Sequence, residues 1–107
     1  MEVQMPLLRF ELQSGAGRTI DQIRDGGLLH ELIPVISDER FACWRFVDPY
    51  GETVFNHLQL PIFRREIDLL RPTNGTRQEA NHILDLVDDL AAVRAGDIHR
   101  YLKIVGD

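Results

Sequence analysis

The sequence predicts a small α+β domain, in which a largely antiparallel sheet of about four strands packs against an antiparallel pair of helices. Three observations lead to this prediction. Residues near both ends of the chain alternate between apolar and polar, which is typical of half-buried strands. The aromatic-rich segment 40–55 has the pattern of a β-hairpin. Two apolar stripes at helical spacing follow one another between residues 57 and 94, so the helices are expected to form one layer beside the sheet.

The first elements are expected before the hairpin. Leu8, Phe10 and Leu12 alternate with polar residues, which predicts a strand. Thr19 and Gln22 have the spacing of a capping box and predict a short helix that ends at the following glycines. Segment 28–36 is apolar but interrupted by a proline, and it predicts a short helix, with a strand as the alternative.

The predicted hairpin spans residues 40–55. Segment 41–47 is apolar on both faces apart from Arg45, as in an interior strand. Segment 48–51, Asp-Pro-Tyr-Gly, has the residues that a type I turn prefers. Segment 53–55 would return as the second strand, with Gly51 in the left-handed conformation of a bulge.

The C-terminal half predicts two helices and a strand. Asn56 can cap a helix over 57–70, with Pro61 tolerated in its early turns. A second helix is expected over 77–94, and the short connection makes the two antiparallel. Alternation over 98–105 predicts the last strand.

Length and composition fit one globular domain over residues 1–107. Apolar residues make up 44% of the chain and charged residues 27%, both close to globular averages. The net charge of −5 argues against nucleic-acid binding, because phosphates require clustered Lys and Arg. Cys43 is the only cysteine, and no signal peptide or apolar span is apparent, so we expect a cytoplasmic protein. Eleven arginines against one lysine suggest a bacterial origin.

The two predicted helices carry a candidate metal or catalytic cluster. Glu66 falls inside the apolar arc of the first helix, while Glu79 and His82 fall at the edge of the arc on the second. A Glu-x-x-His motif facing a glutamate is half of a bundle di-metal site. The other half is missing, so the alternative is ordinary ion pairing, for example with Arg77 or Arg94. We therefore expect no cofactor.

Further chemical candidates are isolated residues. His99 lies near the start of the last strand and could approach Cys43 only if that strand lay beside the hairpin. His82 could be oriented by Asp85 or Asp89, although the same spacing is typical of a solvated acidic face. Gly15-Ala16-Gly17 resembles the opening of a dinucleotide-binding loop, but the third glycine is missing.

The predicted hairpin also carries residues suited to a protein interface. Trp, Tyr and Arg dominate binding energy at such interfaces, and Trp44, Arg45 and Tyr50 lie close together in the sequence. The alternative is that the aromatic residues are core, which is favoured for Trp44 and Phe46.

The function predicted from these observations is a non-enzymatic protein-interaction or regulatory module. Its partner would be another protein or a second copy of the chain in a homodimer, and neither nucleic acid nor a membrane. An acidic chain of this size suits an inhibitor or immunity-type role against a basic protein. The alternative function is a small hydrolase-like or metal-dependent enzyme that uses Glu66, Glu79, His82 and His99.

Overall fold

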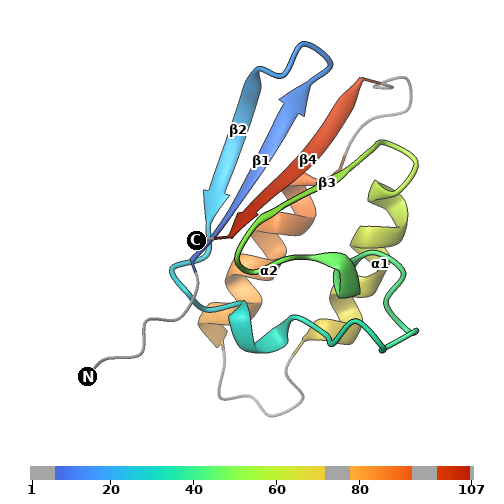
Figure 1. Cartoon of the computed structure of the whole chain (residues 1–107). Helices are drawn as coiled ribbons and strands as arrows, with labels where there is room; N and C mark the ends of the chain where they lie inside the picture. Colours follow the sequence, from blue (N-terminus) through green and yellow to red (C-terminus); the bar gives the residue numbers. More distant parts are fainter. Residues whose placement is uncertain (1–6, 72–77, 93–98, 107) are drawn as a thin grey trace.

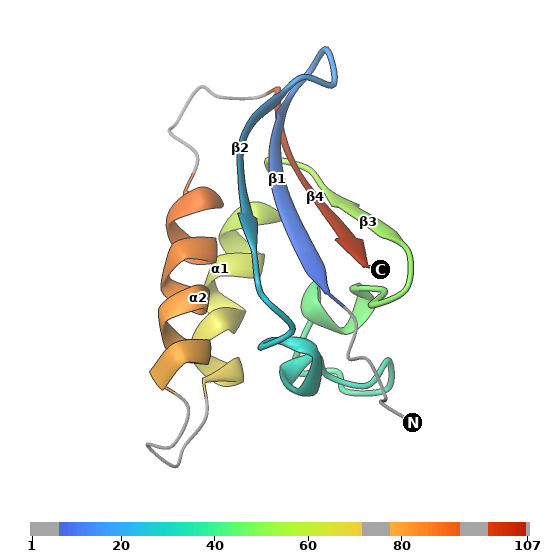
Figure 2. The same ribbon diagram turned by 90° about the vertical axis from the view of Figure 1, so that its left-hand side faces the viewer.

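The computed structural model describes residues 7–71, 78–92 and 99–106. Within these ranges four strands form one antiparallel sheet in the order β2-β1-β4-β3, and two α-helices cover one of its faces (Figures 1 and 2). The α+β class and the antiparallel sheet packed against a helix pair are therefore as predicted. The elements are β1 (Leu8–Ser14), β2 (Thr19–Arg24), β3 (Glu52–Phe55), α1 (Leu60–Leu70), α2 (Gln78–Leu90) and β4 (Arg100–Gly106).

The strand register decides which side chains face the helices. Phe10 pairs with Ile104 across the centre of the sheet, and both are fully buried in the core. Because side chains alternate along a strand, Arg9, Glu11 and Lys103 lie on the opposite face. In Figure 2 no helix covers that face in the part of the chain that the structure describes.

Helix α1 is preceded by a reciprocal pair of side-chain hydrogen bonds. The Oδ1 atom of Asn56 accepts the Gln59 N–H at 3.1 Å, and Gln59 Oε1 accepts the Asn56 N–H at 2.9 Å. This is the hydrogen-bond pattern of a capping box, but it closes the turn over residues 56–59 that precedes the helix. The N-cap residue of α1 is Gln59, not Asn56 as predicted. The helix itself begins at Leu60, three residues later than expected, with Pro61 in its first turn.

A long segment without strands joins β2 to β3 and runs across the lower end of the sheet in Figure 1. It contains two single-turn 3-10 helices, His30–Leu32 and Trp44–Phe46. The Trp44 ring stacks on Phe63 of α1, with centroids 4.5 Å apart and planes inclined by 13°. The Trp44 Nε1–H also donates to the Phe63 carbonyl at 3.0 Å, so this segment is fastened to the helical layer.

The predicted hairpin over 40–55 is wrong. Segment 41–47 is not a strand but turns followed by the second 3-10 helix, and β3 pairs with β4 instead. Its apolar pattern on both faces arises because Phe41, Cys43, Trp44 and Val47 all enter the core. The turn over residues 48–51 is present, closed by a hydrogen bond from the Gly51 N–H to the Asp48 carbonyl, but the Gly51 φ angle is not positive.

The helix predicted from Thr19 is also wrong, because this segment is edge strand β2. The real hairpin joins β1 to β2, with Gly17 at a φ of 81° in the turn. Six residues are too few to form a stable isolated helix, and pairing with β1 is available. The Thr19 hydroxyl donates to Glu11 across the strands at 2.9 Å instead of capping a helix.

The remaining predictions agree with the structure over the described residues. The first strand is confirmed, and segment 28–36 contains only the short 3-10 helix. The second helix spans Gln78–Leu90 and the last strand Arg100–Gly106; residues 72–77 and 93–98, which include the predicted ends of these elements, lie outside the described ranges. Neither α-helix of the described ranges has the length and apolar character needed to cross a membrane.

Candidate interaction surface

The loop between β2 and β3 is held in place by two buried carboxylates. Asp25 accepts the backbone N–H groups of Leu8, Gly27 and Leu29 at 2.8–3.0 Å. Glu66 of α1 accepts those of Ala42, Cys43 and Trp44. A buried charge is tolerated only when hydrogen bonds compensate its lost hydration. The loop is therefore fixed at its start, by Asp25, and again at residues 42–44, by Glu66.

The Glu66 contacts explain how the loop acquires its shape. The carboxylate lies 2.8 Å from the Ala42 nitrogen, 3.1 Å from that of Cys43 and 3.0 Å from that of Trp44. Three successive N–H groups that converge on one anion cannot pair with a neighbouring strand at the same time. This bonding accounts for the turn conformation where the sequence predicted a strand.

The pinned loop exposes a group of large apolar side chains. Tyr50 is 71% exposed, Ile36 63% and Phe46 50%, and Val35 is also exposed. We call these four residues together with Arg45 the loop surface. The Arg45 guanidinium lies over the Phe46 ring, 4.8 Å from its centroid, an arrangement of an aromatic residue and an arginine that is common at protein interfaces.

A groove of about 590 Å³ runs between the two halves of this loop. Ile33, Pro34 and Ile36 line one side, and Arg45 and Phe46 belong to the other. Among the described residues, no carboxylate lies within ion-pair distance of the Arg45 guanidinium, and its Nε atom is buried without a hydrogen-bond partner. His30, Glu31 and Asp48 also line the groove, so it presents polar as well as apolar side chains.

The segment that carries these apolar side chains is acidic. Segment 30–52 holds five carboxylates and two arginines, so it carries more than half of the net negative charge of the chain. The side-chain hydrogen bonds from Arg40 hold the pKa of Asp38 below its ordinary value, and the charge of Arg45 adds a smaller contribution in the same direction. Asp38 is therefore ionised at neutral pH.

The predicted interaction residues do not all reach the surface. Tyr50 is exposed and Arg45 is half-buried, whereas Trp44 is only 1% exposed and belongs to the core. Phe46 shows the reverse, because it was expected in the core and is exposed. The sequence did not indicate that Ile36 and Val35 are exposed, because an aliphatic residue looks the same in a sequence whether it is buried or exposed. The neighbouring Pro34 was the one weak indication of a loop.

The candidate metal and catalytic residues are not brought together. Glu66 is buried, as its place in the apolar arc predicted, and it binds backbone N–H groups; Arg77 and Arg94 lie outside the described residues. Glu79 and His82 are exposed on α2, and His99 lies against Gly15. Across residues 7–71, 78–92 and 99–106, no group of three or more His, Cys, Asp or Glu side chains could hold a metal ion.

Other candidate groups have structural partners. Asp85 accepts a hydrogen bond from Arg71 at 2.6 Å, so the partner of this carboxylate in the described part of the chain is an arginine at the end of α1 and not His82. The glycines at 15 and 17 form the β1–β2 turn, which leads into a strand and not into the helix that a dinucleotide loop requires.

Cys43 is expected to be unreactive in the folded protein. Burial raises the pKa of its thiol from 9.0 to about 11, and the negative charge of Glu66 adds to this effect. Only the thiolate is nucleophilic, so two pKa units lower the reactive fraction at pH 8 about a hundredfold. Iodoacetamide should therefore alkylate Cys43 at least about 100-fold more slowly in the native chain than in chain unfolded by guanidinium. Mass spectrometry of timed samples measures both rates, and equal rates would contradict the burial of this thiol.

No family model, curated protein or solved structure matches this chain.

Proposed function

We propose that the chain is a non-enzymatic interaction module that binds another protein through the loop surface. The observation that carries this proposal is the exposure of Ile36 and Phe46 at one groove, with Tyr50 exposed on the same loop, which is held by buried hydrogen bonds. Large exposed apolar side chains that gather at a groove are typical of protein-binding sites. A preformed loop also loses little conformational entropy on binding.

The charge of the surface selects the kind of partner. Apolar side chains on an acidic segment complement a partner that combines apolar and basic residues. A second copy of the chain would bring one acidic segment against another, which is unfavourable at close range. The proposal is therefore a complex with a basic protein, as expected of an inhibitor or immunity-type module, and homodimerisation through this surface is the alternative outcome of the test.

The test compares two matched double variants in a capture experiment from the native lysate. Ile36→Ser with Tyr50→Ser removes the apolar centre, whereas Leu58→Ser with Leu69→Ser removes two equally exposed leucines elsewhere. Residues at the centre of an interface each contribute about 2 kcal/mol or more, so the first variant should bind the partner at least ~30-fold more weakly. Leu58→Ser with Leu69→Ser should retain it.

Three results decide between the outcomes. A co-purifying protein with a basic isoelectric point, released by salt and lost only in Ile36→Ser with Tyr50→Ser, is the expected result. A partner that the two double variants retain equally would overturn the assignment of the surface. A dimeric mass of the isolated wild-type chain that becomes monomeric in Ile36→Ser with Tyr50→Ser would replace the heteromeric proposal by self-association.

A further inference from the structure

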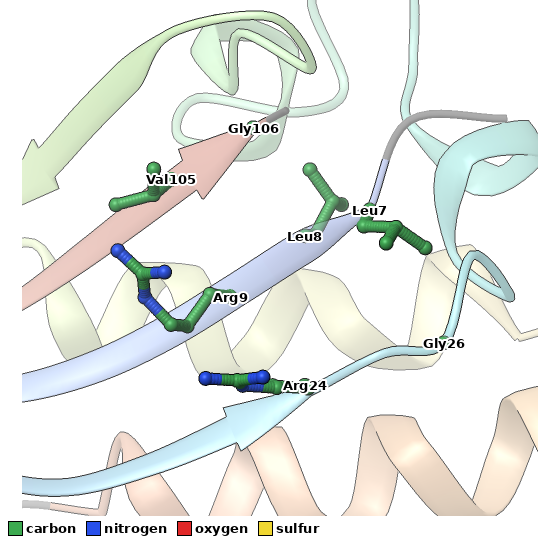
Figure 3. Close-up of a pocket in the computed structure, with 7 residues that line it drawn as sticks. All are labelled: Leu7, Leu8, Arg9, Arg24, Gly26, Val105 and Gly106. Carbon is green, nitrogen blue, oxygen red and sulfur yellow. The ribbon is translucent and has the colours of Figure 1, made fainter. Parts of the chain in front are cut away.

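A second hollow, formed by residues outside the loop surface, lies at one end of the sheet. It has a volume of about 340 Å³, and its walls include Leu7, Arg9, Arg24, Gly26 and Val105. Figure 3 shows the Arg9 and Arg24 side chains over the same face of the sheet, with Leu7 and Val105 at the borders of the hollow. Its size falls within the range of small-molecule sites, which begins at roughly 300 Å³.

The strand register forces the two arginines together. Arg9 on β1 is directly opposite Arg24 on β2. The Asp25 N–H donates to the Leu8 carbonyl, so Leu8 and Asp25 form a hydrogen-bonded pair. Because hydrogen-bonded and non-hydrogen-bonded pairs alternate along antiparallel strands, Arg9 and Arg24 form a non-hydrogen-bonded pair. Side chains approach most closely at such pairs, and like charges placed there are destabilising.

Only one of the two charges is compensated within the described part of the chain. The Arg9 Nε atom donates to Glu11 at 3.0 Å, and no described carboxylate lies within ion-pair distance of Arg24. Burial acts to raise the pKa of Glu11, but the hydrogen bonds from Arg9 and Thr19 and the charges of Arg9 and Lys103 outweigh it and lower the pKa. Glu11 is therefore ionised, and the group Arg9, Arg24 and Glu11 carries one net positive charge.

We infer that this hollow binds a small organic monocarboxylate, with Arg9 and Arg24 on its carboxylate and Leu7 and Val105 against its apolar body. A guanidinium fork matches the two oxygens of a carboxylate. One negative charge neutralises the site, whereas phosphate at neutral pH carries about −1.5 to −2. The ligand also relieves the repulsion between the two arginines, which gives its binding a physical driving force.

The test is an NMR titration of the ¹⁵N-labelled full chain with benzoate, and with benzamide as the neutral ligand of the same shape. Benzoate should shift the amide signals of Arg9, Arg24 and Gly26 and bind at least ~10-fold more tightly than benzamide, because only benzoate forms charge-assisted hydrogen bonds. Inorganic phosphate, which lacks the apolar body, should also bind more weakly than benzoate. Equal binding of benzoate and benzamide would overturn the inference.

Two variants locate the site. Arg24→Gln should weaken benzoate binding at least ~10-fold, whereas Arg65→Gln, at an exposed arginine on α1, should leave it within about twofold. The amide spectrum of each variant shows whether it is folded, and the comparison of benzoate with benzamide on the wild-type chain needs no variant. Unchanged affinity in folded Arg24→Gln, or shifts that cluster at Arg65, would overturn the assignment.

A carboxylate also occurs at the end of every peptide chain. Acetyl-Ala-Leu with a free C-terminus and its C-terminal amide therefore form a second pair of ligands. Tighter binding of benzoate than of the free dipeptide supports a small acid as the ligand, while tighter binding of the dipeptide overturns this and assigns the same arginine pair to a chain terminus.

Discussion

Replacing Glu66 by alanine is expected to lower the free energy of unfolding by about 4 kcal/mol. The carboxylate accepts three backbone N–H groups, and two of them, those of Cys43 and Trp44, belong to buried residues that water does not reach. A buried donor left without a partner costs about 1–3 kcal/mol, and bonds to a charged acceptor lie at the upper end. The missing side chain also leaves a cavity beside Trp44.

Guanidinium unfolding, followed both by circular dichroism and by the fluorescence of Trp44, measures this effect. Glu66→Gln keeps one carbonyl oxygen and should lose roughly half as much stability. Asp68→Ala removes an exposed carboxylate from the same helix, which forms an ion pair with Arg71, and should change stability by less than about 0.5 kcal/mol. A loss below about 1 kcal/mol in Glu66→Ala would show that the three bonds do not hold the loop.

Gly106→Ala is expected to cost roughly 3 kcal/mol, because no space exists for a methyl group. A Cβ atom at this position would overlap the carbonyl group of Pro49, and the Gly106 N–H donates to the Gly51 carbonyl at 2.7 Å. The obstacle is backbone, so it cannot move aside as a flexible side chain would. The end of β4 must then separate from the turn over 48–51.

Gly51→Ala is the matched control for this prediction. A Cβ at Gly51 meets the carboxylate of Asp48, which is the end of a side chain and can rotate away. Gly51→Ala should therefore lower the free energy of unfolding by only about 1 kcal/mol. This is the usual contribution of one hydrogen bond, here the bond from the Tyr50 N–H to Asp48 that the rotation breaks. Thermal unfolding of both variants measures the difference, and equal losses would contradict the close approach at Gly106.

The sequence predicted those elements in which apolar residues repeat at the spacing of a strand or a helix. Leu8 and Phe10, or Leu102 and Ile104, alternate because one face of a strand enters the core. β2 was missed because most of its residues are exposed, and an edge strand without a buried face has no alternating pattern. Its pairing depends on β1, a non-local contact that the local capping-box spacing at Thr19 does not reveal.

The candidate sites were harder to predict than the elements. The apolar arc correctly indicated that Glu66 is buried, but its partners are backbone N–H groups, which every residue carries and which leave no mark in a sequence. Because of the same contacts, segment 41–47 forms turns and a 3-10 helix instead of a strand. In this conformation Trp44 lies in the core and Phe46 is exposed. The pair Arg9 and Arg24 becomes visible only when β1 and β2 form a hairpin, so the incorrect helix at Thr19 concealed it.

The two carboxylates that fix the loop have a consequence for how its binding specificity can change. Asp25 and Glu66 recognise the peptide backbone, so their hold on the loop does not depend on which side chains the loop displays. Substitutions at Val35, Ile36, Phe46 or Tyr50 can therefore accumulate without disturbing the attachment points. In this respect the loop resembles a binding loop of an antibody: the backbone attachment stays the same while the exposed side chains can vary. A new partner can therefore be bound without a change of fold.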